Sequence, residues 1–235
     1  MNNFESCSLA IQCQGQLLLL HPQGVIFWPE QHILFAADVH VGKEHRFGRA
    51  GIPIPGGISE ATLVNLFSLA EEAGAQRLII LGDFMHSAPL SSESWLAELS
   101  RLLDKNLNLA IEVVAGNHDK LSGQTTIDPR IVWHQTSLTV EPFVLKHEPG
   151  KDDKGFVLCG HLHPAWRLKQ SRRASLKAPA FWFTKDYAVL PAFGHFTGGV
   201  VVDANLKEDS IYMIGENSVV KVPLDRTHPK RRTQA

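Results

Sequence analysis

The sequence predicts an α/β fold in which a parallel sheet with helices outside it is followed by a second, mainly β half. Two patterns support this: strand and helix signals alternate over the first half, and short β-rich runs replace the helical pattern from about residue 131. With 235 residues, 44% of them hydrophobic, the chain can bury a sizeable core. We therefore expect one domain, residues 1–225, followed by a basic tail, residues 226–235.

The first half contains two successive β-α-β patterns. The apolar run 32–37 predicts a buried strand that ends at Asp38, and residues 59–74 predict an amphipathic helix with Ser59 as its N-cap. Strand 77–81, helix 92–103 and strand 109–114 follow. Because each strand is followed by a polar residue, the pattern places polar side chains at the carboxyl ends of parallel strands.

The second half carries short runs rich in β-branched and aromatic residues, typical of strands. These runs are 140–145, 155–159, 187–190, 199–202 and 210–213. We expect them to form a second sheet packed on the first.

Composition excludes several classes of protein. The 23 basic and 24 acidic side chains give a net charge of −1, so no global positive field attracts nucleic acid or membrane. No apolar run approaches the ~20 residues of a membrane helix, and no secretory signal is recognised, which predicts a cytoplasmic protein. The 3 cysteines form no CxxC pair, which argues against a disulfide framework and a thiolate zinc site.

Five polar motifs each follow an apolar run. In chain order they are Asp38-Val39-His40, Gly82-Asp83, Gly116-Asn117-His118-Asp119, His147, and Gly160-His161-Leu162-His163. Imidazole and carboxylate groups suit Mn²⁺, Fe and Zn²⁺, and the absence of cysteine from the motifs favours a catalytic metal site. Strand alternation is expected to point Asp38 and His40 the same way, and likewise His161 and His163. The preceding glycines permit close approach of the backbone.

The ordered motifs resemble the calcineurin-like metallophosphoesterase superfamily, with its pattern D-x-H, G-D, G-N-H-[D/E], H and G-H-x-H. The resemblance implies a four-layer αββα sandwich, two mixed β-sheets flanked by helices, and two divalent metal ions. It assigns one metal to Asp38, His40 and His163, the other to Asn117, His147 and His161, and makes Asp83 the bridge. A shared carboxylate is physically reasonable because it offsets the repulsion between two cations.

The resemblance leaves His118 without a metal. It is therefore the candidate acid that protonates the leaving oxygen during attack of water on phosphorus, a role suited to a group that titrates near pH 7. Asp119 or Asp38 is expected to orient it. No covalent enzyme intermediate is required.

Longer strings resemble one bacterial branch, the ligase-associated DNA damage response endonuclease family called PdeM. They are ADVHVGKE at 37–44, AGIPIP at 50–55, GHLHP at 160–164 and LPAFG at 190–194. This resemblance implies Mn²⁺-dependent hydrolysis of phosphodiester bonds in single-stranded or flapped DNA during repair, in company with a DNA ligase, a helicase and an exonuclease. Fe or Zn²⁺ remains compatible with the ligand types.

Two other family branches match less well. Residues 82–86 read GDFMH and depart from the G-D-x-x-D-R of protein Ser/Thr phosphatases. His118 stands where lipid-precursor pyrophosphate hydrolases tend to carry arginine. The alternative functions are a phosphodiesterase or phosphatase for small nucleotides, and a scaffold without catalysis. Against the scaffold, His118 and every assigned ligand are present.

Some residues have simpler alternative roles. Asp38, Asp83 and Asn117 each resemble ordinary turn or helix-capping residues when taken singly. His134 also follows an apolar run and is a rival to His147.

Two basic residues are candidates for contact with substrate. Lys43 can approach a substrate phosphate, or it can belong to a solvated loop. Arg167 and the basic residues after it can contact phosphates, or they can form a solvated face. His45, His86 and His195 belong to no motif, and a surface or supporting role is expected for each.

Overall fold

The computed structural model describes residues 3–122, 127–169, 175–195, 197–205 and 207–223. The basic tail predicted at 226–235 lies outside these residues.

The first sheet has seven strands, which occur in space in the same order as in the sequence. They are β1 (Leu9–Cys13), β2 (Gln16–Leu20), β3 (Ile26–Trp28), β4 (Ile33–Ala36), β5 (Arg77–Leu81), β6 (Ala110–Val114) and β7 (Ile131–His134). Strands β1 to β4 pair antiparallel, whereas β4 to β7 pair parallel. The parallel half confirms the predicted β-α-β units, because α3 (Ile58–Ala73) connects β4 to β5 and α4 (Ser94–Lys105) lies between β5 and β6.

The second sheet contains nine strands and is also mixed. Its main path runs β14 (Val200–Val201), β11 (Pro164–Lys169), β12 (Ser175–Phe183), β13 (Tyr187–Val189), β10 (Phe156–Cys159), β9 (Phe143–Leu145) and β8 (Leu138–Val140). Strand β15 (Ser210–Ile214) pairs with β12, and β16 (Val219–Lys221) pairs with β15. Strands β9, β10 and β13 are parallel, so they too end at one edge.

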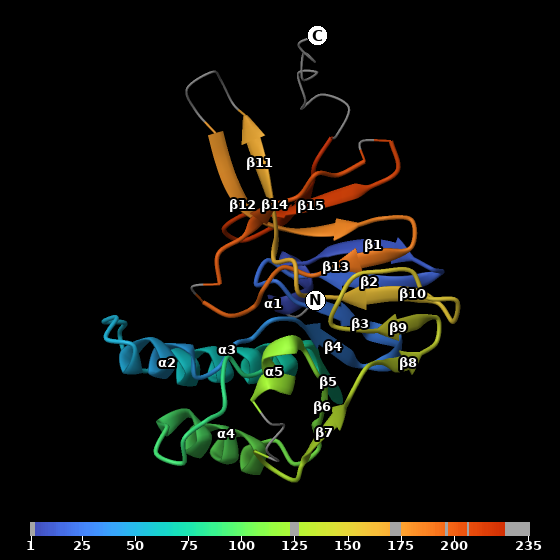
Figure 1. Ribbon diagram of the computed structural model, residues 1–235. Coiled ribbons are helices and arrows are strands. Elements are labelled where there is room, and N and C mark those ends of the chain that lie inside the picture. The colour runs from blue at the N-terminus through green and yellow to red at the C-terminus, as the bar shows by residue number, and fades with distance from the viewer. Residues whose placement is uncertain (1–2, 123–126, 170–174, 196, 206, 224–235) are drawn as a thin grey trace.

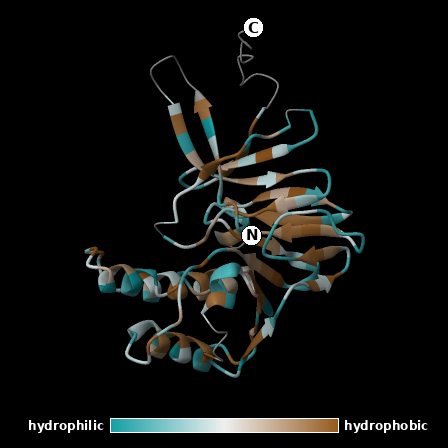
Figure 2. Cartoon of the chain, viewed as in Figure 1, coloured by the Kyte–Doolittle hydropathy of each residue, from teal (hydrophilic) through white to brown (hydrophobic). Residues whose placement is uncertain are grey.

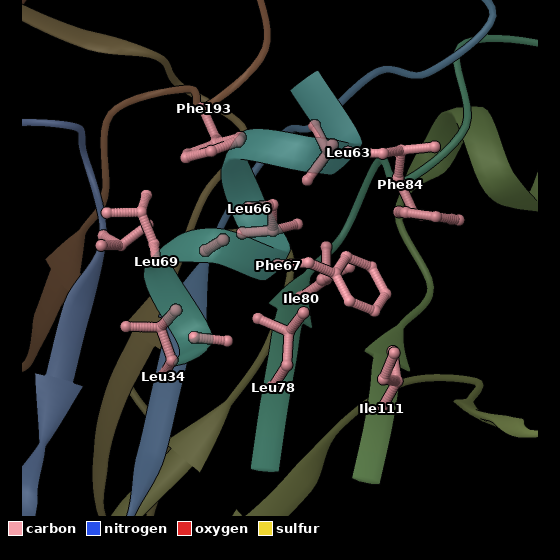
Figure 3. Close-up of a cluster of buried hydrophobic side chains, with 14 of the residues drawn as sticks. Leu34, Leu63, Leu66, Phe67, Leu69, Leu78, Ile80, Phe84, Ile111 and Phe193 are labelled. Atoms are coloured by element: carbon pink, nitrogen blue, oxygen red, sulfur yellow. The ribbon is translucent and has the colours of Figure 1, made fainter. Parts of the chain in front are cut away.

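Two hydrophobic clusters hold the layers together. One lies between the first sheet and its helices, where Leu66 and Phe67 of α3 face Leu78 and Ile80 of β5 (Figure 3). The other fills the space between the sheets, and Figure 2 shows hydrophobic colouring concentrated on the strands there. Each fully buried side chain of this kind contributes about 1.5–3 kcal/mol. The predicted pair of mixed sheets is confirmed, and helices α3 and α4 lie outside the first of them.

The helices are few and lie early in the chain (Figure 1). Besides α3 and α4 they are α1 (Asn3–Cys7), the 3₁₀ turn η1 (Pro29–Gln31), α2 (Lys43–Arg49) and α5 (Asn117–Leu121). Within the described ranges no helix follows Leu121. None of the described helices combines the length and apolarity needed to cross a bilayer.

Three of the predicted elements differ in detail from the structure. Helix α3 begins at Ile58 after Gly57, so Ser59 is not its N-cap, and its hydroxyl instead donates to Glu44 Oε2. The predicted helix 92–103 is shifted by two residues and spans α4. The run 140–145 is not one strand, because it turns at Pro142 and forms the β8–β9 hairpin; proline has no N–H to donate to a ladder.

Candidate metal centre

The five polar motifs meet at the carboxyl ends of strands from both sheets. Those from the first sheet follow β4, β5 and β6, and those from the second follow β9 and β10. Strand ends on one side of parallel strands lie together, which makes this edge the usual site for ligands in open α/β sheets.

Asp38 is at the centre of the first group of side chains. It is fully buried; its Oδ2 accepts a hydrogen bond from the His161 backbone N–H at 2.8 Å. Its Oδ1 lies 3.4 Å from His163 Nε2 and 3.9 Å from His147 Nδ1. Ligand atoms of Asp38, His40 and His163 all lie within 4.8 Å of one another.

Asp83 is at the centre of the second group. Its Oδ2 lies 3.6 Å from His147 Nε2 and 3.9 Å from His40 Nε2. His147 Nε2 in turn lies 2.9 Å from Asn117 Oδ1 and 3.0 Å from His161 Nδ1. Asp38, Asp83 and His147 form a second set of ligand atoms within 4.8 Å. The structure thus brings together all seven residues that the resemblance assigned to two metals.

The paired motifs aim both side chains at the cluster, but not through strand alternation. Asp38 and His40 have φ of 53° and 52°, and His161 and His163 have φ of 71° and 47°, all in the left-handed region. The prediction that an extended backbone orients them is therefore wrong. Asp and His are among the non-glycine residues most often found in this conformation.

The three glycines predicted to allow close approach do so, and a Cβ on Gly160 would meet Asp38 Oδ2. A Cβ on Gly82 would overlap the His147 ring, and a Cβ on Gly116 would overlap the carboxylate and backbone N of Asp83. Gly82 also has a φ of 84°. The predicted close approach of backbone to the polar cluster is confirmed at all three positions.

Burial and charge at the centre fit a cation. Asp38 Oδ1 and His40 Nδ1 are buried and have no hydrogen-bond partner among the described residues. A buried carboxylate oxygen that has only imidazole nitrogens at 3.4 and 3.9 Å is poorly compensated for its lost hydration, and a cation removes that cost. The ion-pair contacts of Asp38 and Asp83 are with imidazoles. This donor set of oxygen and imidazole nitrogen suits divalent transition metals.

The pKa of His40 agrees with this interpretation, whereas those of His163 and Asp83 are shifted toward the protonated forms, which a bound cation would displace. Burial, together with nearby positive groups of which His163 is the largest contributor, lowers the pKa of His40 to about 2. Its imidazole is therefore neutral, which is the form that binds metals. Burial lowers the pKa of His163, but the adjacent Asp38 carboxylate raises it further, so its net pKa lies above the ordinary value. Burial raises the pKa of Asp83.

His118 lies beside the cluster and is held by two backbone contacts. Its N–H donates to Asp83 Oδ1 at 2.9 Å, and its ring Nδ1 lies 2.9 Å from the carbonyl oxygen of His86. Neither Asp119 nor Asp38 supplies that ring contact, so the expectation about its orientation is corrected. A carbonyl at Nδ1 fixes a proton there and leaves Nε2 to exchange protons.

Asp119 acts on the backbone instead. Its carboxylate is fully buried and accepts hydrogen bonds from the N–H groups of Gly116, Phe84 and Met85 at 2.9, 3.2 and 2.8 Å. These bonds fasten the loop after β5, which carries Asp83 and the carbonyl of His86. Asp119 is therefore a positioning residue.

His86 is the residue that sequence reasoning missed. Its ring stacks on His118 with centroids 4.9 Å apart, and its ligand atoms group with those of His40 and His118. The available signal was its place three residues after Asp83, in the same loop.

The remaining candidates lie around or away from the cluster. Lys43 shares the wall of a small pocket with His40 and His195, and burial lowers its pKa. Arg167 is exposed on β11, four residues beyond His163, which corresponds to about 13 Å along a strand. His134 contacts Glu112 at 2.8 Å and is not part of the grouped ligand atoms, unlike its rival His147.

Comparisons with known proteins identify the family. The family model described as calcineurin-like phosphoesterase matches residues 31–206. The crystal structure of Pseudomonas putida nuclease MPE is 33% identical, with a TM-score of 0.77, over 91% of this chain and 100% of that one. The phosphoesterase YfcE from E. coli is 16% identical, with a TM-score of 0.40, over 82% and 98% of the two chains. No curated protein matches significantly.

These findings bear out the predicted resemblance and the predicted class of enzyme, a hydrolase of phosphoester bonds. Divalent metals are used in this family, and the structure has a candidate cluster for them. The chain belongs to the calcineurin-like phosphoesterase family.

Proposed function

We propose that this protein is a manganese-dependent phosphodiesterase that cleaves DNA. The observation that carries the proposal is the convergence of Asp38, Asp83 and five other oxygen or nitrogen donors at one edge of both sheets. The similarity to a nuclease over the whole length of that nuclease adds independent support.

The residues divide into two sets of metal ligands. One set is Asp38, His40 and His163, the other is Asn117, His147 and His161, and Asp83 belongs to both. Support comes from the contacts that Asp83 Oδ2 makes toward both His40 and His147. When bound, two divalent cations supply the charge that polarises a phosphate and activates water.

The chain's own groups do the rest of the chemistry. His118 Nε2 gives a proton to the departing oxygen, because its Nδ1 is held by the His86 carbonyl. Asp83 accepts from the His118 backbone N–H and so keeps the acid beside the ligands. Asp119 holds the loop that contains both partners of His118.

Single-stranded or flapped DNA is the proposed substrate, in a repair setting in the cytoplasm with a DNA ligase, a helicase and an exonuclease. Lys43, half-buried beside His40, is the proposed phosphate contact, and Arg167 is a more distant one. The net charge of −1 favours a short footprint on nucleic acid, and it also supports small nucleotide phosphodiesters as the second candidate substrate.

Two assays test this function. We expect the purified protein with Mn²⁺ to nick circular single-stranded DNA and to hydrolyse bis-p-nitrophenyl phosphate, and a chelator to abolish both activities. His118→Asn is expected to lower the rate of DNA nicking about 100-fold or more while metal content is kept, because only the acid is lost. The rate for the aryl diester should fall less, because p-nitrophenolate leaves without a proton. His32→Asn, at an exposed left-handed position, is the matched control. Inactivity with Mn²⁺, Fe²⁺ and Zn²⁺ alike would refute the proposal.

A further inference from the structure

A polar pocket of about 480 Å³ opens next to the candidate metal centre. His147 belongs to both, since its ring contacts Asp83 and Asn117 and also lines the pocket. The pocket wall comes from α5, from the β7–β8 turn and from the loop after β9, at residues Ala115, Lys120, Thr136, Ser137, Lys146 to Gly150 and Asp152. Its volume lies within the ~300–1,000 Å³ of small-molecule sites.

The charges on its wall balance. Lys146 Nζ lies 2.6 Å from Asp152 Oδ2, so this lysine is neutralised within the pocket. Lys120 and Glu148 are exposed and add one charge of each sign. A wall with no net charge gives a polyanion no electrostatic gain, because attraction and repulsion cancel. It suits an uncharged polar group.

The remaining wall groups are hydrogen-bonding ones. Thr136 and Ser137 each offer a hydroxyl that donates and accepts, and the lysines and carboxylates add donors and acceptors. A nucleoside has this character: a sugar with hydroxyl or ether oxygens and a base with amide-like edges, without charge. The phosphate that carries the nucleoside would then lie toward His147, at the cluster.

We infer that this pocket binds the nucleoside that is esterified to the scissile phosphate, and that it makes the enzyme prefer nucleoside diesters over simple aryl diesters. The inference rests on the proposed phosphodiesterase function and specifies its substrate. Ser137 is the residue through which the pocket is best blocked, because it is exposed and a larger side chain there does not disturb the core.

The test compares two substrates with the same leaving group. Thymidine 5′-p-nitrophenyl phosphate and bis-p-nitrophenyl phosphate both release p-nitrophenolate, so their difference reports the group that stays on phosphorus, a nucleoside in one and a second nitrophenyl group in the other. Ser137→Trp fills the pocket, and Thr139→Trp, at an exposed position on β8 outside the described pocket wall, is the matched control. We expect Ser137→Trp to lower kcat/KM for the thymidine ester about tenfold or more, with little change for the aryl diester.

Binding without turnover gives a second measurement. Fluorescence anisotropy of a labelled oligothymidylate with metal-free protein is expected to show weaker binding by Ser137→Trp than by Thr139→Trp, and thermal unfolding checks that both variants fold. An equal fall for both esters, or no fall for either, overturns the inference. If the wild-type protein hydrolyses neither ester, the proposed function fails, and unchanged anisotropy with Ser137→Trp then overturns the pocket assignment separately.

Discussion

Replacing Asp119 by asparagine removes the charge that fastens the loop after β5. In the native protein its Oδ2 accepts from Gly116 and Phe84, and its Oδ1 accepts from Met85. Asparagine has a single acceptor oxygen. The NH₂ group of asparagine must therefore take the place of either Oδ1 or Oδ2 and face a backbone N–H there, so that at least one donor loses its partner.

The magnitude follows from these three bonds. Loss of one hydrogen bond to a charged group costs about 1.5–3 kcal/mol, and conversion of the other two to neutral bonds costs about 1 kcal/mol each. Burial raises the pKa of the Asp119 carboxyl, because removing the charged group from water destabilises the ionised form. The neutral amide of asparagine does not carry this desolvation cost. The three losses sum to about 3.5–5 kcal/mol and that relief lowers the sum, so a net destabilisation of at least about 2 kcal/mol is expected.

Urea unfolding of the metal-free protein measures this effect. A loss of this size should lower the midpoint by about 1 M at an ordinary dependence on urea. The rate of nicking of circular single-stranded DNA should fall about tenfold or more, because the carbonyl that orients His118 shifts with the loop and the leaving oxygen of DNA needs a proton. Asp128→Asn is the control, since Asp128 also accepts a backbone N–H, from Arg130, but outside the loop after β5. It also loses its ion pair with the Arg130 guanidinium, which should lower the midpoint only slightly and leave the rate unchanged. An unchanged midpoint and rate for Asp119→Asn would show that the three bonds do not hold the loop.

Two further substitutions test other parts of the structure. Gly82→Ala should reduce the amount of bound metal, measured by elemental analysis, because the new Cβ meets the His147 ring. Gly74→Ala is the control: it has the same left-handed backbone cost of about 1–2 kcal/mol but an open environment, so this variant should keep its metal. Glu112→Gln should cost about 1 kcal/mol near neutral pH. Burial raises the pKa of Glu112, but the hydrogen bonds from Arg77 contribute to lowering it, to a net value below the usual one. The contribution of Glu112 to the free energy of unfolding is therefore present above about pH 5 and disappears as acid protonates the carboxylate. Unfolding curves of wild type and variant should converge at low pH. A difference that stays constant with pH would contradict this assignment.

The parallel half of the first sheet could be predicted because its strands are buried on both faces and are read as apolar runs. The β1–β2 hairpin was not predicted. Its first strand, Leu9–Cys13, is partly exposed, so its sequence shows only a weak apolar pattern. Helix α2 was missed for a different reason. Its seven residues, KEHRFGR, show no apolar stripe, and its position depends on tertiary contacts such as that between Arg49 and Glu93.

Residue identities pointed to the cluster, but not to the way its parts are held. The types and order of Asp38, Asp83 and His147 were visible in the sequence, because ligand chemistry depends on residue type. The contact between His118 and the His86 carbonyl was not visible, since a backbone acceptor leaves no signature in the residue type. The same holds for the three amides that Asp119 binds.

Backbone conformation at the cluster explains why strand alternation was the wrong model. Of the seven non-glycine residues with positive φ in the described ranges, five are Asp38, His40, Asp83, His161 and His163. At about 1 kcal/mol each, this strain is comparable to the lower end of a domain's stability, about 5 kcal/mol, and needs compensation.

Hydrogen bonds between the loops after β4 and β5 supply part of that compensation. The N–H groups of Asp38, His40 and Val41 donate to the carbonyls of Gly82, Asp83 and Phe84 at 3.1, 2.9 and 2.9 Å. Pairing of the two chain segments thus continues beyond the strands, but with left-handed residues at Asp38, His40 and Asp83. The side chains of these residues contact the loops after β6, β9 and β10: Asp38 lies against His161 and His163, and Asp83 lies against His118 and His147. For Asp38, His40 and Asp83, the strain and the convergence of ligands therefore share one cause, the irregular continuation of β4 and β5 past their regular ends.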